Sequence, residues 1–91
     1  MMYIKKPRII EAFQYDGDLI NQNGKYYVPK WAEDAHKKGI IFSKDGEMYI
    51  KTLEGNHHIS YGDFVIKGIK GEIYPCNPDI FKQTYQLVEE A

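Results

Sequence analysis

The stretch from Gly62 to Tyr85, GDFVIKGIKGEIYPCNPDIFKQTY, constrains the fold more than any other part of this chain. The residues from Phe64 to Ile66 form an apolar run, which is typical of a strand buried on both faces. Gly68 and Gly71 bracket a tight connection, after which Glu72 to Pro75 is expected to return as the next strand. The stretch therefore predicts a hairpin whose first strand lies in the interior of a sheet.

A helix start follows this hairpin. Asn77 suits an N-cap, and Pro78 and Asp79 suit the first helical positions, where a missing N–H costs nothing and negative charge is favoured. We expect a short C-terminal helix that packs through one face, followed by a last strand from Tyr85 to Val88. The predicted packing residues of this helix are Ile80, Phe81 and Thr84.

Upstream, Arg8 to Tyr15 is mostly apolar and is predicted to be a central strand. A mid-chain helix is expected between Pro29, at its first position, and Gly39, just beyond its last turn. Acidic residues lie in the N-terminal half of this helix and basic residues at its end, which complements the helix dipole. Trp31 is the expected anchor of this helix in the core.

The segment between this helix and Gly62 indicates a β-meander. Ile40 to Ser43 and Met48 to Thr52 flank Asp45-Gly46, which is a strong hairpin signal, and His57 to Ser60 is the next expected strand. The predicted class is α+β: an antiparallel meander sheet of about five to six strands, packed with one mid-chain helix and one short C-terminal helix. We expect residues 1–91 to form a single domain.

Composition narrows the class of protein. Hydrophobic residues make up 43% and charged residues 27% of the chain, and no apolar run reaches the length of a membrane span. One cysteine fits a reducing compartment, so we expect a cytoplasmic location. The net charge of −1, with scattered basic residues, makes nucleic acid an improbable partner.

Catalytic and metal-binding residues are sparse. Cys76 stands before a helix start that favours a thiolate, and His57 or His58 could supply a base, which defines a Cys-His enzyme hypothesis. The simpler interpretation is that Cys76 is a small packing residue, and we favour it. The two histidines are adjacent on a strand and point to opposite faces, so they cannot chelate one metal together. We predict no metal site and no cofactor.

Two sets of residues are candidates for binding. Lys67, Lys70 and the helix start at Asn77 could combine into an anion pocket, although turn glycines with solvated lysines are the simpler interpretation. Tyrosines, which give large contact area at low entropy cost, are candidates for contact with a partner. The five tyrosines chosen are Tyr26, Tyr27, Tyr49, Tyr61 and Tyr74.

The opening IKKPRIIEAFQYDG, the middle MYIKTLEG and the end YGDFVIKGIKGEIYPCNPDIFKQTYQLVEE resemble a widespread family of small bacterial phage and prophage proteins. Members of that family end in GDYIIKGVKGEFYPCKPDIFEKTYE or close variants. Here Phe64 replaces a tyrosine, and Asn77 replaces a lysine, which weakens an anion site. The resemblance implies a phage origin, for which host-directed factors are common, and it implies no established activity.

Three functions follow as hypotheses. The first is a non-enzymatic phage accessory protein that binds, and inhibits, a host or anti-phage defence protein through an exposed sheet face or edge with tyrosines and acidic residues. The second is an oligomeric protein that sequesters a nucleotide-like signalling ligand. The third is a Cys76-dependent enzyme. An exposed strand edge in so small a domain also favours a homodimer.

Overall fold

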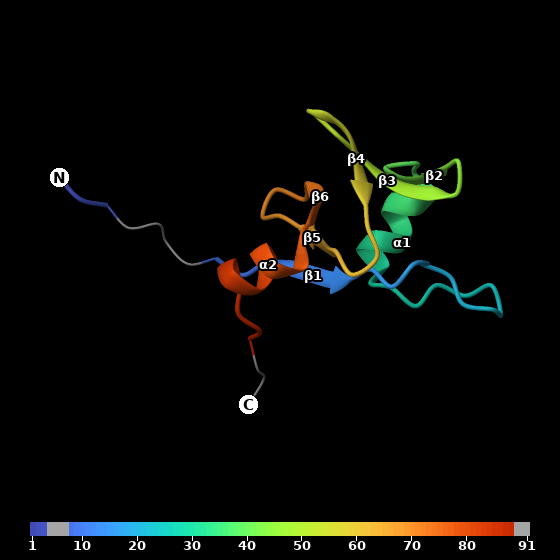
Figure 1. Cartoon of the computed structure of the whole chain (residues 1–91), viewed down its shortest axis with the longest axis horizontal. Coiled ribbons are helices and arrows are strands. Elements are labelled where there is room, and N and C mark those ends of the chain that lie inside the picture. Colours follow the sequence, from blue (N-terminus) through green and yellow to red (C-terminus); the bar gives the residue numbers. More distant parts are fainter. Residues whose placement is uncertain (4–7, 89–91) are drawn as a thin grey trace.

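The computed structural model describes residues 1–3 and 8–88, and this part of the chain contains two helices and six strands in two three-stranded antiparallel sheets (Figure 1). The predicted α+β class is confirmed, but the strands are divided between two sheets instead of forming a single meander. The elements are β1 (Glu11–Gln14), α1 (Lys30–Lys37), β2 (Ile41–Lys44), β3 (Glu47–Thr52), β4 (Gly55–Ile59), β5 (Phe64–Lys67), β6 (Ile73–Cys76) and α2 (Pro78–Thr84).

The first sheet has the strand order β1-β5-β6. The apolar strand β5 lies in its centre, as its sequence predicts, and Val65 and Ile66 are fully buried. The prediction of a central strand at Arg8 to Tyr15 is wrong, because β1 pairs with β5 alone and therefore forms an edge. Its apolar composition misled the prediction: Ile9 is 79% exposed and lies just before the strand instead of inside a sheet.

The second sheet is the meander β2-β3-β4. Asp45 and Gly46 both adopt positive φ, at 54° and 80°, which is the backbone of the tight two-residue turn that joins β2 to β3. The predicted Asp-Gly hairpin is confirmed. Because side chains alternate along a strand, one face of this sheet carries the buried residues Ile41, Ile50 and Ile59, and the other face points outward.

The two sheets and α1 enclose one hydrophobic core. Its buried members include Ala32 and Ala35 of α1, Ile41 and Ile50 of the second sheet, and Val65 of the first. Trp31 is half-buried at the rim of this core, with its ring 5.5 Å from that of Phe13, so it borders the core and does not fill it.

The limits of α1 agree with the sequence to within one residue. Pro29 occupies the N-cap position, one residue before the predicted place, because its extended backbone (ψ 152°) precedes the first turn. Gly39, with φ of 79°, lies just beyond the helix as expected.

The short helix α2 lies on the first sheet and is held there mainly by one ring. The Asn77 side chain accepts a hydrogen bond from the Asp79 N–H at 2.8 Å, which confirms the predicted cap, and the Phe81 ring stacks on Phe64 with centroids 3.9 Å apart. Ile80 and Thr84 are exposed, so their predicted packing role is wrong. This helix has only seven residues, and Phe81, which lies between Ile80 and Thr84 in the sequence, is the one that reaches the sheet.

The predicted last strand is also wrong. Residues 85–88 have no strand partner in the part of the chain that is described, although Tyr85 has extended backbone. The Tyr85 ring instead packs on Phe81, with centroids 4.9 Å apart. Neither helix of the described chain has the length and apolar character needed to cross a bilayer.

Candidate functional site

Tyrosines and carboxylates gather on one side of the molecule, where the turn after β1 meets the outer face of the second sheet. We call this region the tyrosine–acid surface. It comprises Asp16, Asp18, Tyr27, Glu47, Tyr49, His58 and Tyr61, which the contacts described in the next paragraphs join into one surface.

Two exposed tyrosines flank the turn at Asp16 and Gly17. The Tyr27 hydroxyl donates a hydrogen bond of 2.6 Å to Asp16 Oδ1, and this bond, the largest cause, raises the pKa of Tyr27 to about 12. On the other side, a Cβ placed on Gly17 would lie 3.7 Å from the Tyr61 ring, so that ring lies directly beside the turn. Tyr27 is 47% and Tyr61 80% exposed, so both rings are available for contact.

The second sheet contributes a row of three rings on its outward face. Tyr49 of β3 pairs with Phe42 of β2 and with His58 of β4, and the register places all three side chains on the face opposite Ile50. The Phe42 and Tyr49 rings stack with centroids 5.6 Å apart, and His58 meets Tyr49 edge-on at 5.4 Å.

Hydrogen bonds join this row to the turn. His58 Nε2 lies 2.9 Å from Glu47 Oε2, and His58 Nδ1 lies 3.3 Å from the hydroxyl of Ser60, the residue before Tyr61. Ionic and hydrogen-bonding groups are therefore fixed beside aromatic rings, which orders the side chains before any partner binds.

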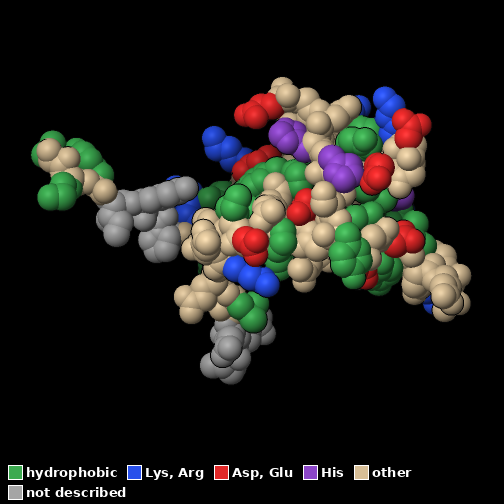
Figure 2. All heavy atoms as spheres, in the orientation of Figure 1, with side chains coloured by type: hydrophobic (Ala, Val, Ile, Leu, Met, Phe, Trp, Pro, Cys, Tyr) green, Lys and Arg blue, Asp and Glu red, His purple; other side chains and the backbone are tan. Residues whose placement is uncertain are grey.

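Tyr15 shows that the carboxylates converge. This residue is only 7% exposed, and its pKa is raised first by burial and then by the negative charges of Asp18, Asp16 and Glu47. Asp16 and Asp18, which follow Tyr15 in the chain, and Glu47 of β3 are therefore close enough for their charges to act on Tyr15. Figure 2 shows acidic, histidine and hydrophobic side chains side by side on the upper part of this face.

The other two candidate tyrosines lie elsewhere. Tyr26 is half-buried, and its hydroxyl is 2.7 Å from His36 Nδ1 of α1. Tyr74 lies in β6, where burial and a hydrogen bond with Tyr85 raise its pKa to about 12. The structure thus brings three of the five predicted tyrosines into one surface. Phe42 and His58 were not among the predicted partner-binding residues, although the Asp-Gly turn would have placed Phe42 opposite Tyr49.

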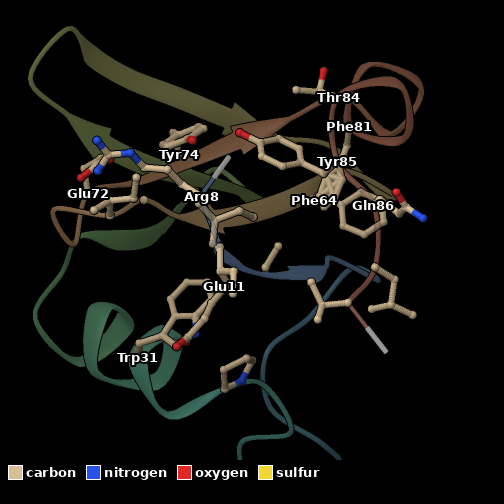
Figure 3. A pocket seen from close by; sticks show the side chains of 18 of the residues that line it. Arg8, Glu11, Trp31, Phe64, Glu72, Tyr74, Phe81, Thr84, Tyr85 and Gln86 are labelled. Carbon is tan, nitrogen blue, oxygen red and sulfur yellow. The ribbon is translucent and has the colours of Figure 1, made fainter. Parts of the chain in front are cut away.

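A second feature is an open groove of about 1450 Å³ beside the edge strand β1 (Figure 3). One wall carries Trp31 and Pro29 at the start of α1, and the other carries Phe64, Phe81 and Tyr85. The lining is mostly apolar, and Arg8, Lys70, Glu72 and Lys82 supply its charged side chains along with Glu11 of β1. The edge of β1 runs between the two walls.

The residues of the predicted anion pocket are not brought together. Lys67 pairs with Ile73 at the turn of the β5-β6 hairpin, whereas Asn77 follows the far end of β6. Four residues of strand separate the two ends, which is about 13 Å. The turn also holds its own carboxylate, because Glu72 Oε2 accepts a hydrogen bond of 3.1 Å from the Lys70 N–H.

Cys76 is a half-buried free thiol in β6. Burial, followed by the negative charge of Asp63, raises its pKa, which is opposite to the thiolate-favouring shift that the helix start predicts. His57 and His58 are both exposed on β4, and His58 is engaged with Glu47. Within residues 1–3 and 8–88, no group of three or more His, Cys, Asp or Glu side chains could hold a metal ion.

Comparisons with protein-family models, curated proteins and solved structures found no match to this chain.

Proposed function

We propose that this chain is a non-enzymatic accessory protein of a bacterial phage, which binds and inhibits a host or defence protein through the tyrosine–acid surface. The observation that carries the proposal is the turn at Asp16 and Gly17, where the exposed Tyr27 donates a hydrogen bond to Asp16 and the exposed Tyr61 ring lies beside Gly17. The phage origin rests on the sequence resemblance described above, and the proposed place of action is the cytoplasm of the host.

The chemistry of this surface fits a basic patch on the partner. Tyrosine supplies a large amphipathic contact with few rotatable bonds, and such rings are common in interface centres. Carboxylates at the rim attract Lys and Arg side chains and raise the rate of encounter at low salt. A folded protein with a positively charged functional surface, such as one that binds nucleic acid or phosphorylated ligands, is the partner class that this chemistry favours.

The two alternative functions receive no comparable support. A nucleotide-like ligand would need Lys67, Lys70 and Asn77 together, yet Asn77 lies at the opposite end of the hairpin from both lysines. A Cys76-dependent enzyme would need an activated thiol, and the surroundings of Cys76 raise its pKa. Binding to a protein is the remaining hypothesis, and it is the one for which the described residues form a continuous surface.

The test is capture of a partner from a bacterial host lysate with the tagged protein, repeated with matched variants. Tyr61→Ala combined with Glu47→Gln removes an exposed ring and a charge, and we expect at least about a tenfold loss of the captured protein. Leu53→Ala combined with Glu54→Gln changes an exposed turn at the other end of β3 and should leave capture intact.

Salt gives a second readout. Capture should weaken as ionic strength rises, because screening shortens the reach of exposed charges. A partner retained equally by the surface variant and by the turn variant would disprove the assigned surface. A partner with an acidic contact surface would contradict the proposed pairing of carboxylates with a basic patch.

A further inference from the structure

His58 lies in the chain of hydrogen bonds that orders the tyrosine–acid surface. An ionised carboxylate can only accept, so the contact of 2.9 Å with Glu47 Oε2 requires that His58 Nε2 carries a hydrogen. In the neutral imidazole, Nδ1 is then an acceptor, and the Ser60 hydroxyl, 3.3 Å away, donates to it. A neutral His58 therefore satisfies both of its neighbours.

Protonation changes the charge of His58 and allows both contacts to remain. The added proton goes to Nδ1, which then donates to Ser60 Oγ, because a hydroxyl oxygen can also accept. Nε2–H continues to donate to Glu47, and this bond becomes an ion pair. The ring can thus stay edge-on to Tyr49, with centroids 5.4 Å apart, in either state. Imidazole is the side-chain group that gains a proton near neutral pH, so this charge responds to mild acidification.

The fixed charges near this imidazole balance one another. The register places two ammonium groups on the same face of the sheet, those of Lys51 on β3 and Lys44 on β2, and Glu47 supplies one carboxylate there. Beyond the end of β4, the Asp63 carboxylate accepts a hydrogen bond of 2.9 Å from the Ser60 N–H. Two positive groups therefore stand against two negative groups, and the proton on the imidazole decides the sign of the local charge.

Other titratable groups near β4 leave this balance unchanged. β6 packs against β4 and carries Tyr74 and Cys76, and burial raises the pKa of both, so both stay neutral near pH 7. His57 pairs with Ile50 and therefore lies on the opposite face of the sheet. Within the described part of the chain, His58 is thus the histidine of this face.

We propose that protonation of His58 weakens the binding of a basic partner and makes its capture pH-dependent. The inference rests on the proposed function, in which carboxylates of the tyrosine–acid surface meet a positively charged patch. A proton on His58 neutralises the charge of Glu47 and adds to the charges of the two lysines, so the surface loses attraction for that patch while it keeps its shape. Neutral pH therefore favours retention of the partner, and mild acid favours its release.

Binding by matched variants at two pH values tests this proposal. The protein that the wild type captures from the lysate is purified, and its dissociation constants are measured at pH 7.5 and 5.5 in low salt. The weakening at pH 5.5 should be about threefold greater for the wild type than for His58→Gln, as expected of one exposed charge. His57→Gln, on the opposite face, is the matched control and should show the same weakening as the wild type.

Equal weakening of the wild type and His58→Gln would overturn the inference and leave the proposed function standing. Failure of the wild type to capture any protein at pH 7.5 would instead overturn the proposed function, and the inference with it. NMR spectra of the free chain give a test that needs no partner. Contacts between the His58 and Tyr49 rings should persist from pH 7.5 to 5.5, and their loss would overturn the inference, because the surface would then change its shape as well as its charge.

Discussion

The two sheets leave different surfaces open. In the first sheet, β5 is covered on one face by the core and on the other by Phe81 of α2, and the open part is the edge of β1. In the second sheet, one face carries Ile41, Ile50 and Ile59 into the core, and the open part is the whole outward face, with Tyr49 at its middle.

This difference separates two kinds of binding. An edge offers backbone hydrogen bonds, which any extended strand can satisfy, so it does not by itself select a partner. A face offers side chains, and their identity selects a partner. The outward face of the second sheet carries the rings of Phe42, Tyr49 and His58 beside Lys44, Glu47 and Lys51, so we propose that this sheet recognises another protein.

The largest effect should come from breaking the core that joins the two sheets. Ile50 of β3 is fully buried, so Ile50→Ala is expected to lower the free energy of unfolding by about 2–5 kcal/mol. Urea denaturation followed by Trp31 fluorescence and by circular dichroism should give one coincident transition. Two separate transitions would show that the sheets fold independently, contrary to the shared core.

A smaller effect should be confined to the first sheet. Phe81→Ala removes the ring stacked on Phe64, and we expect a loss of about 2 kcal/mol with faster proteolysis of residues 78–88. Peptide mapping after limited proteolysis locates the change. Cleavage that appears first in β2-β3-β4 would contradict the assignment of α2 to the first sheet alone.

The sequence predicted local features well. The Asp45-Gly46 turn, the Asn77 cap and the buried strand β5 were all found, because each depends on residues that are neighbours along the chain. The edge position of β1 was not found, since an apolar strand beside an open groove has the same composition as one between two strands. The division into two sheets was also missed, because it depends on which strands pair across long loops.

The predictions for the candidate site also agreed with the structure only in part. Tyrosine was the right residue type for a surface, but only the register could show that Tyr49 lies beside His58, whereas Tyr74 lies in the other sheet. The anion set is not assembled within one chain, because Lys67 and Asn77, ten positions apart in the sequence, lie at opposite ends of one hairpin. The helix start beside Cys76 left an activated thiol open as an alternative to the favoured packing cysteine, and burial raises the pKa of this thiol.

The cap of α2 provides a finer test of the first sheet. Asn77→Ala removes the acceptor for the Asp79 N–H and should cost about 1 kcal/mol. Thermal unfolding gives the magnitude, and Asn77→Ser, which keeps a capping oxygen, should recover most of the loss. An alanine variant as stable as the wild type would mean that α2 depends on Phe81 alone.

The smallest effect concerns Tyr27 and appears only at high pH. Its pKa is 10.0 in a model compound and about 12 in the folded protein, because the neutral hydroxyl donates to Asp16. The folded state therefore retains a proton that the unfolded state has lost, so stability present below pH 10 declines as the pH rises toward 12. The free energy of unfolding of the wild type should fall more steeply with pH in this range than that of Tyr27→Phe. Equal slopes would contradict the hydrogen bond.

The central claim, that the outward face of the second sheet recognises another protein, is tested most directly by amide hydrogen exchange of this chain with and without a captured partner. In the complex, amides around Tyr49 and Tyr61 should exchange more slowly than in the free chain, because the partner covers this face, and amides of β1 should not change. If the amides around Tyr49 and Tyr61 exchange at the same rate in both samples, the account of the tyrosine–acid surface is contradicted.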